Sequence, residues 1–120
     1  METAVVTEWF WVLYADTSTG CDVIARGVRA YPDPPAARTA ARALAGTGPA
    51  QVLSVQDADG CWRWRLYGDD GAEAAISAGR FTQAHACYVD INRLLRVLRR
   101  LPLRVGLWQA RHAQAPRDGR

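Results

Sequence analysis

The sequence predicts an α+β domain in which two β-β-β-α repeats form a single antiparallel sheet, with two helices packed on one face. One observation is a tryptophan-rich segment that occurs twice: residues 9–14 (WFWVLY) align with residues 62–67 (WRWRLY), with four of six positions identical. The other is a change from alternating to helical spacing after each copy. Each repeat is too small to stand alone securely, so the two are expected to share one core.

The second repeat, residues 50–101, gives the clearer order of elements. Residues 61–67 alternate strictly, with Trp62, Trp64 and Leu66 on one face. A helix is expected from Thr82, as its N-cap, to Pro102, because apolar residues then recur at three- and four-residue steps. The other expected elements are a strand over 50–55, a hairpin turn over 57–60, a turn over 68–71 and a weaker strand over 74–79.

The first repeat, residues 8–46, follows the same order with one difference. A strand over 9–14, a turn over 16–20 and a strand over 22–30 precede a helix. Asp33 is expected to cap that helix, with Pro34 in its first position. No turn separates residues 4–6 from Trp9, so the first hairpin is either truncated or merged into one long strand.

The repeats place the domain within residues 1–101 and leave residues 102–120 as a C-terminal extension. Residues 109–120 are rich in Gln, Ala, Arg and Pro and are expected to be disordered. Residues 103–108 (LRVGLW) alternate and have no counterpart in the repeats. We expect them to cover the first repeat, either against Phe10 and Val12 or as an added strand.

Several motifs together resemble the YegP-like family of small bacterial and archaeal proteins. They are residues 59–66 (DGCWRWRL), a turn ending in Gly71, and a helix that starts with Phe81, Thr82 and Ala86. The resemblance implies one or two β-β-β-α repeats, joined in a single antiparallel sheet, whose helices exchange to pack on one face. It brings no catalytic residues to this chain.

Charge is distributed unevenly along the chain. All 15 basic residues are arginine and the net charge is +3. Residues 1–79 hold six arginines against ten acidic residues, a net of −4, whereas residues 80–120 hold nine against two, a net of +7. The basic region indicates either an acidic partner such as nucleic acid or an arginine-rich composition with solvated helix ends. The candidate basic strip is Arg93, Arg96, Arg100 and Arg104.

Catalytic, metal and membrane signals are weak. Cys21, Cys61 and Cys87 are widely spaced without a C-x-x-C, which favours a reducing cytoplasm and no metal site. His85 and Asp90 are five apart on the expected helix, too far round to pair, and no phosphate loop is present, so neither an enzyme nor a cofactor is expected. The acidic start shows no secretory signal and no apolar run has membrane-spanning length.

The alternation in the two tryptophan-rich segments predicts which side chains point away from the core. With the tryptophans facing the helices, the candidate interaction face is Phe10, Val12, Tyr14, Arg63, Arg65 and Tyr67. Such a face fits a non-catalytic interaction module that self-associates, as a homodimer, through the open sheet face. The alternative is weak single-stranded nucleic-acid binding through the same aromatics and arginines.

Overall fold

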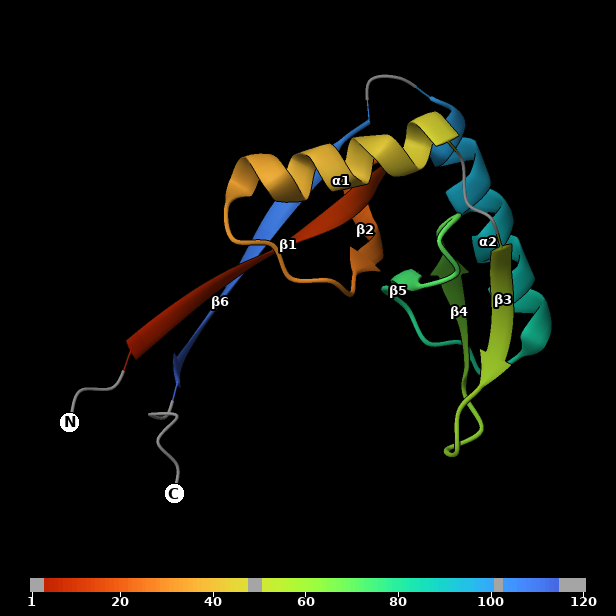
Figure 1. Ribbon diagram of the computed structural model, residues 1–120. Helices are drawn as coiled ribbons and strands as arrows, with labels where there is room; N and C mark the ends of the chain where they lie inside the picture. The colour runs from red at the N-terminus through yellow and green to blue at the C-terminus, as the bar shows by residue number, and fades with distance from the viewer. Residues whose placement is uncertain (1–3, 48–50, 101–102, 115–120) are drawn as a thin grey trace.

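One six-stranded sheet and two helices make up the fold (Figure 1). The computed structural model describes residues 4–47, 51–100 and 103–114. Neighbouring strands pair antiparallel throughout, in the order β3-β4-β5-β2-β1-β6. The elements are β1 (Ala4–Thr17), β2 (Gly20–Gly27), α1 (Pro34–Thr47), β3 (Gln51–Gln56), β4 (Trp62–Tyr67), β5 (Glu73–Ser77), α2 (Ala84–Arg99) and β6 (Val105–Gln114). The predicted α+β class with a single antiparallel sheet is confirmed.

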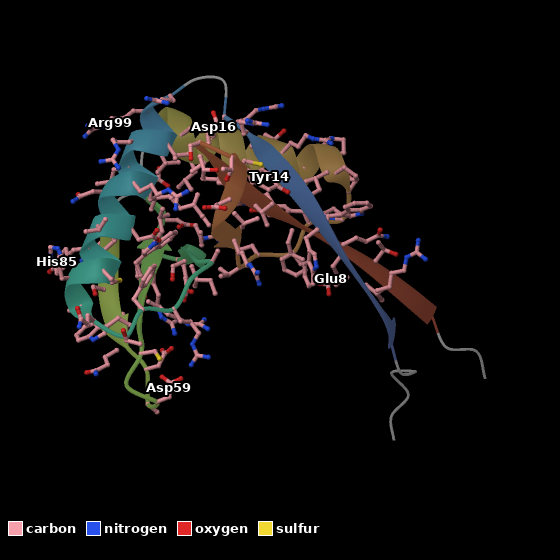
Figure 2. All side chains as sticks on the ribbon, turned by 180° about the vertical axis from the view of Figure 1, so that it is seen from behind. Glu8, Tyr14, Asp16, Asp59, His85 and Arg99 are labelled. Atoms are coloured by element: carbon pink, nitrogen blue, oxygen red, sulfur yellow. The ribbon has the colours of Figure 1, made fainter. Side chains whose placement is uncertain are left out.

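Both helices lie on the same face of the sheet, where one continuous core joins them to the strands. Trp11 of β1 and Trp64 of β4 are almost fully buried there, packed with Leu44 of α1 and Leu94 of α2. The alternate residues of each strand face the other side, which no described helix covers. Figure 2 shows this side of the first half, where β6 and β1 lie in front of α1. We call it the open face.

The strand β1 distinguishes between the two expected forms of the first hairpin, truncated or merged into one long strand. It runs for 14 residues, so the first hairpin of this half is merged into one strand. Its outer edge pairs with β6, from Ala4 opposite Gln114 to Leu13 opposite Val105. The expected added strand over residues 103–108 is therefore confirmed from Val105 onward.

Two predictions about the C-terminal extension are wrong. β6 continues to Gln114, so residues 109–114 are not disordered; residues 115–120 lie outside the described residues. The domain boundary at 101 is also wrong, because β6 is an integral strand of the sheet. Composition misled here because pairing along the edge of β1 uses backbone N–H and C=O groups, which any non-proline residue supplies.

The two halves of the sheet carry corresponding pairings. Trp9 N–H donates to Tyr31 O at 2.9 Å, and Trp62 N–H donates to Phe81 O at 2.6 Å, with the reverse bond at 2.8 Å in both pairs. The halves meet where β2 pairs with β5, with Arg26 opposite Ile76 at the middle of the register. That the halves arose as repeats stays a prediction.

The helix starts differ from each other. Asp33 Oδ1 accepts the N–H of Ala36 at 2.8 Å, so the predicted cap of α1 is confirmed. The prediction that Thr82 caps α2 is wrong, because Gln83 is the N-cap, in an extended conformation and without a side-chain hydrogen bond. α2 ends at Arg99, and the predicted stop at Pro102 lies outside the described residues.

The helix exchange implied by the family resemblance is not observed. α1 packs over β1 and β6, whereas α2 packs over β4 and β3 and reaches β2. Each helix therefore covers mainly the strands of its own half. Neither helix in the described part of the chain is long and apolar enough to cross a membrane.

Candidate interaction surface

The open face carries all six residues of the predicted interaction face, but in two separate groups. Phe10, Val12 and Tyr14 stand on β1, while Arg63, Arg65 and Tyr67 stand on β4, all partly buried. Strands β5 and β2 lie between β1 and β4. Adjacent strands are spaced about 4.8 Å apart, so the two groups lie roughly 14 Å from each other. They form two surfaces of different chemistry.

The group on β1 gains an aromatic partner from the C-terminal strand. Trp108 stands directly opposite Phe10 in the β1–β6 register, and their ring centroids lie 5.0 Å apart at an interplanar angle of 51°. This tilted geometry is favourable for aromatic pairs. Trp108 nevertheless keeps 56% of its surface exposed. We call Phe10, Val12, Tyr14 and Trp108 the aromatic patch.

A shallow pocket of about 400 Å³ lies beside the aromatic patch. It is lined by the patch itself and by residues of the two central strands, among them Val23, Arg26 and Ile76. Among the described residues that line it, Arg26 alone carries a charge. The pocket therefore offers an apolar recess to a side chain from outside.

The ring of Tyr14 lies at the edge of this pocket because a glycine on β6 leaves room for it. Its ring lies across Gly106, where an added Cβ would come within 2.5 Å of the tyrosine Cε2 and 2.6 Å of its oxygen. Tyr14 N–H also donates to Arg104 O at 3.0 Å. The close approach of β6 thus depends on the absence of a side chain at position 106.

The group on β4 is charged but internally compensated. Arg65 Nη1 lies 3.0 and 3.3 Å from the two carboxylate oxygens of Glu73. Arg63 Nε lies 3.2 Å from Asp57 Oδ2, but without the alignment of a hydrogen bond. Each arginine on this half of the open face therefore has a carboxylate beside it, which reduces its attraction for a phosphate.

The basic strip comes together around a second hollow, where the end of β1 meets the C-terminal end of α2. Arg93, Arg96, Arg100 and Arg104 all line it. Arg93 lies 3.3 Å from Asp22 and 4.0 Å from Asp90, and Arg104 binds Asp16. Among the residues that the structure describes, Arg96 and Arg100 have no acidic partner.

The sequence did not reveal which residues complete these surfaces. Asp57 was expected only as a turn residue, Glu73 lay between a predicted turn and a predicted strand, and Val23 and Ile76 carried no signal of a shared pocket. Alternation assigned faces within residues 9–14 and 61–67 only, and the strand order that brings β2 and β5 together was not deducible from it. The exposed pairing of Trp108 with Phe10 matches one of the two expectations for the extension.

Metal and redox features are sparse in the described chain. Within residues 4–47, 51–100 and 103–114, no three His, Cys, Asp or Glu side chains are grouped as metal ligands would be. Cys21, Cys61 and Cys87 are free thiols and range from exposed to buried. Asp90 accepts the indole N–H of Trp64 at 2.7 Å, which gives this carboxylate a structural role.

Comparison with known proteins returned no family model, no curated protein and no solved structure that matches the chain. The resemblance to the YegP-like family therefore stays a prediction.

Proposed function

We propose that this protein is a non-catalytic interaction module that self-associates through the aromatic patch on its open face. The observation that carries the proposal is the exposed Trp108–Phe10 pair beside an apolar pocket. Apolar surface of this kind is costly in water, and a contiguous patch is typical of a protein contact site.

The open face is divided into an aromatic patch on β1 and a charged group on β4, and this arrangement favours a second copy as the partner. In a twofold contact the same surface meets itself. Two aromatic patches facing each other would bury Trp108 of each copy in the pocket of the other. The Arg63–Asp57 and Arg65–Glu73 pairs would stay at the rim in contact with water, which is the usual anatomy of an interface.

Single-stranded nucleic acid is the competing ligand for the same face. A stacking platform needs aromatic side chains with cationic groups near them along one groove. Here the arginines of β4 stand across two strands from the aromatic patch and are beside carboxylates. This separation supports the protein contact over the nucleic-acid contact.

The proposed location is a reducing cytoplasm. The support comes from the three free cysteines, which are widely spaced in the sequence. Measuring the oxidation state of the three cysteines in intact cells would check it.

The test is sedimentation equilibrium over a wide range of protein concentration. The wild type should show a concentration-dependent dimer, and Phe10→Glu should abolish it by placing a charge inside the contact. Leu53→Glu is the matched control, because Leu53 is 39% exposed on the open face of β3, outside the patch. Equal dissociation in both variants, or a monomer at every concentration, would contradict the proposal.

An oligonucleotide assay separates the competing ligand. A mobility shift of single-stranded DNA that falls steeply with salt and is lost in the double variant Arg63→Ala/Arg65→Ala would favour nucleic-acid binding. We expect no shift that depends on these two arginines, because their charge is already compensated on the same face.

A further inference from the structure

The hollow at the C-terminal end of α2 is a second site, which shares Tyr14 with the aromatic patch. It lies where the end of β1, the last turns of α2 and the segment leading into β6 converge. Figure 2 shows Asp16 and Tyr14 near this convergence, beside the end of α2 that carries Arg99. Its volume is about 450 Å³, within the range of pockets that hold small molecules.

Arginines outnumber the acidic groups in and around the hollow. Four arginines and Asp16 line it, and Asp22 and Asp90 lie beside Arg93, which leaves an excess of one positive charge. Arg104 is held by Asp16, and Arg93 by Asp22 and Asp90. These ion pairs leave the other two guanidinium groups without a carboxylate partner among the described residues.

Arg96 and Arg100 are those two groups. Both side chains are exposed, and neither has an acidic partner among the described residues. Six other arginines of the described chain pair with carboxylates, and Arg96 and Arg100 differ from Arg99, which also has no ion pair among the described residues, because they line the hollow. A guanidinium offers five N–H donors in a planar fork that matches the oxygens of a phosphate.

The other lining residues form the walls of the hollow. Ala15, Val97 and Leu103 supply apolar walls, and Tyr14 contributes part of the wall nearest β6. A concave site with a cationic rim and apolar walls fits a compact molecule that carries a doubly charged group, rather than a long flat polymer.

We propose that this hollow binds a small molecule through its phosphate group, with Arg96 and Arg100 as the principal contacts. The dianionic charge of a phosphate matches these two guanidinium groups, which have no carboxylate partner among the described residues, better than a single carboxylate does. This site does not rest on the self-association proposed for the open face, and either proposal can fail alone.

The test is isothermal titration of the full chain with inorganic phosphate and with pyrophosphate at low salt. Arg96→Gln and Arg100→Gln should each weaken binding about tenfold or more, as expected for loss of a charge-assisted hydrogen bond. The matched control is Arg99→Gln: Arg99 is exposed on the same helix turn but does not line the hollow. It should change the affinity by less than about threefold, because only screened, distant charge is lost.

Three results would overturn the proposal. Pyrophosphate that releases no heat and shifts no amide resonance of Ala15 or Val97 would show that the hollow is not a phosphate site. An equal loss of affinity in Arg99→Gln would reduce the effect to general positive charge. Single-stranded DNA that binds through Arg96 and Arg100 with an affinity rising with its length would assign the arginines to nucleic acid instead.

Discussion

The two halves of the sheet share an interior and differ on their surface. The inward residues of β1 and β4 are the same in kind, with Trp11 and Trp64 nearly completely buried against the helices. The outward residues are apolar in β1, where β4 has two arginines with carboxylates beside them. A common packing pattern therefore forms the core of both halves, while the open face has a different chemistry in each half.

The halves also differ in where their third strand comes from. β4 pairs with β3, which precedes it in the chain through a short hairpin turn closed by Gly60 N–H donating to Asp57 O at 2.9 Å. β1 pairs with β6 from the far end of the chain. The first half therefore closes only when the chain through β6 is present, and closing such a distant contact costs more chain entropy.

The largest expected effect comes from removing the distant strand. Ending the chain after Arg104 deletes β6 and leaves the outer edge of β1 unpaired along ten positions. We expect a loss of more than about 5 kcal/mol in the free energy of unfolding, which is comparable with the whole stability of a domain of this size. Urea denaturation followed by circular dichroism measures it.

The control for this deletion ends the chain after Gln114, which keeps β6. It should unfold at the same urea concentration as the full chain. A deletion after Arg104 with an unchanged midpoint would show that β6 is not part of the cooperative fold.

The next largest loss of stability is expected when either of the two buried tryptophans is replaced. Trp64→Ala and Trp11→Ala should each cost about 3–5 kcal/mol, because a large buried ring is removed. Replacing each tryptophan by phenylalanine should have a different effect on stability in the two halves. Trp64→Phe breaks the bond to Asp90 and leaves its carboxylate without that donor, whereas the indole of Trp11 has no hydrogen bond among the described residues. We expect Trp64→Phe to cost about 1–3 kcal/mol more than Trp11→Phe in thermal unfolding; equal costs would contradict this asymmetry.

A smaller effect tests the close packing in the first half. An added Cβ on Gly27 would come within 2.8 Å of Trp11 Cε2, so Gly27→Ala should cost about 1–3 kcal/mol through overpacking. Gly46→Ala is the control, because nothing lies within 4 Å of its added Cβ and it stands in α1. The control should leave stability equal or slightly higher. If both variants melt at the same temperature, the contact with Trp11 does not constrain position 27.

The smallest effect is the pH dependence from Asp70. The backbone N–H of Ala72, followed by the side chain of Arg29, lowers the pKa of this exposed carboxyl below its ordinary value of 3.8. The folded state therefore favours the carboxylate, and the resulting stability is present above pH 3.8 and lost as the pH falls through the folded pKa. Asp70→Asn should flatten the stability curve slightly below pH 3.8 and leave its slope at neutral pH unchanged. A steeper acid limb in the variant would have the wrong sign.

Local sequence patterns predicted the class of the fold and the facing of its residues. The repeated Trp-x-Trp segment and its alternation assigned the inward tryptophans and the outward positions of β1 and β4. The cap of α1 followed from Asp33 and Pro34, because capping depends on adjacent residues alone. These features are local, and local chemistry was enough to find them.

Long-range pairing accounts for most of what the sequence did not predict. Residues 109–114 have no strand pattern of their own, and they are ordered by the free edge of β1. The ion pair between Arg65 and Glu73 and the hollow around Arg96 depend on which strands and helices become neighbours. Strand order sets those neighbours, and no spacing in a single sequence encodes it.

The most direct measurement of the central claim is an isotope-filtered NOE experiment on a mixture of labelled and unlabelled chains. If the aromatic patch is the contact between two copies, contacts between chains should involve the rings of Phe10 and Trp108 and the methyl groups of Val12. The methyl groups of Leu53, on the other half of the open face, should show none. Contacts between chains that involve Leu53 or α2 but not Phe10 and Trp108 would contradict the account.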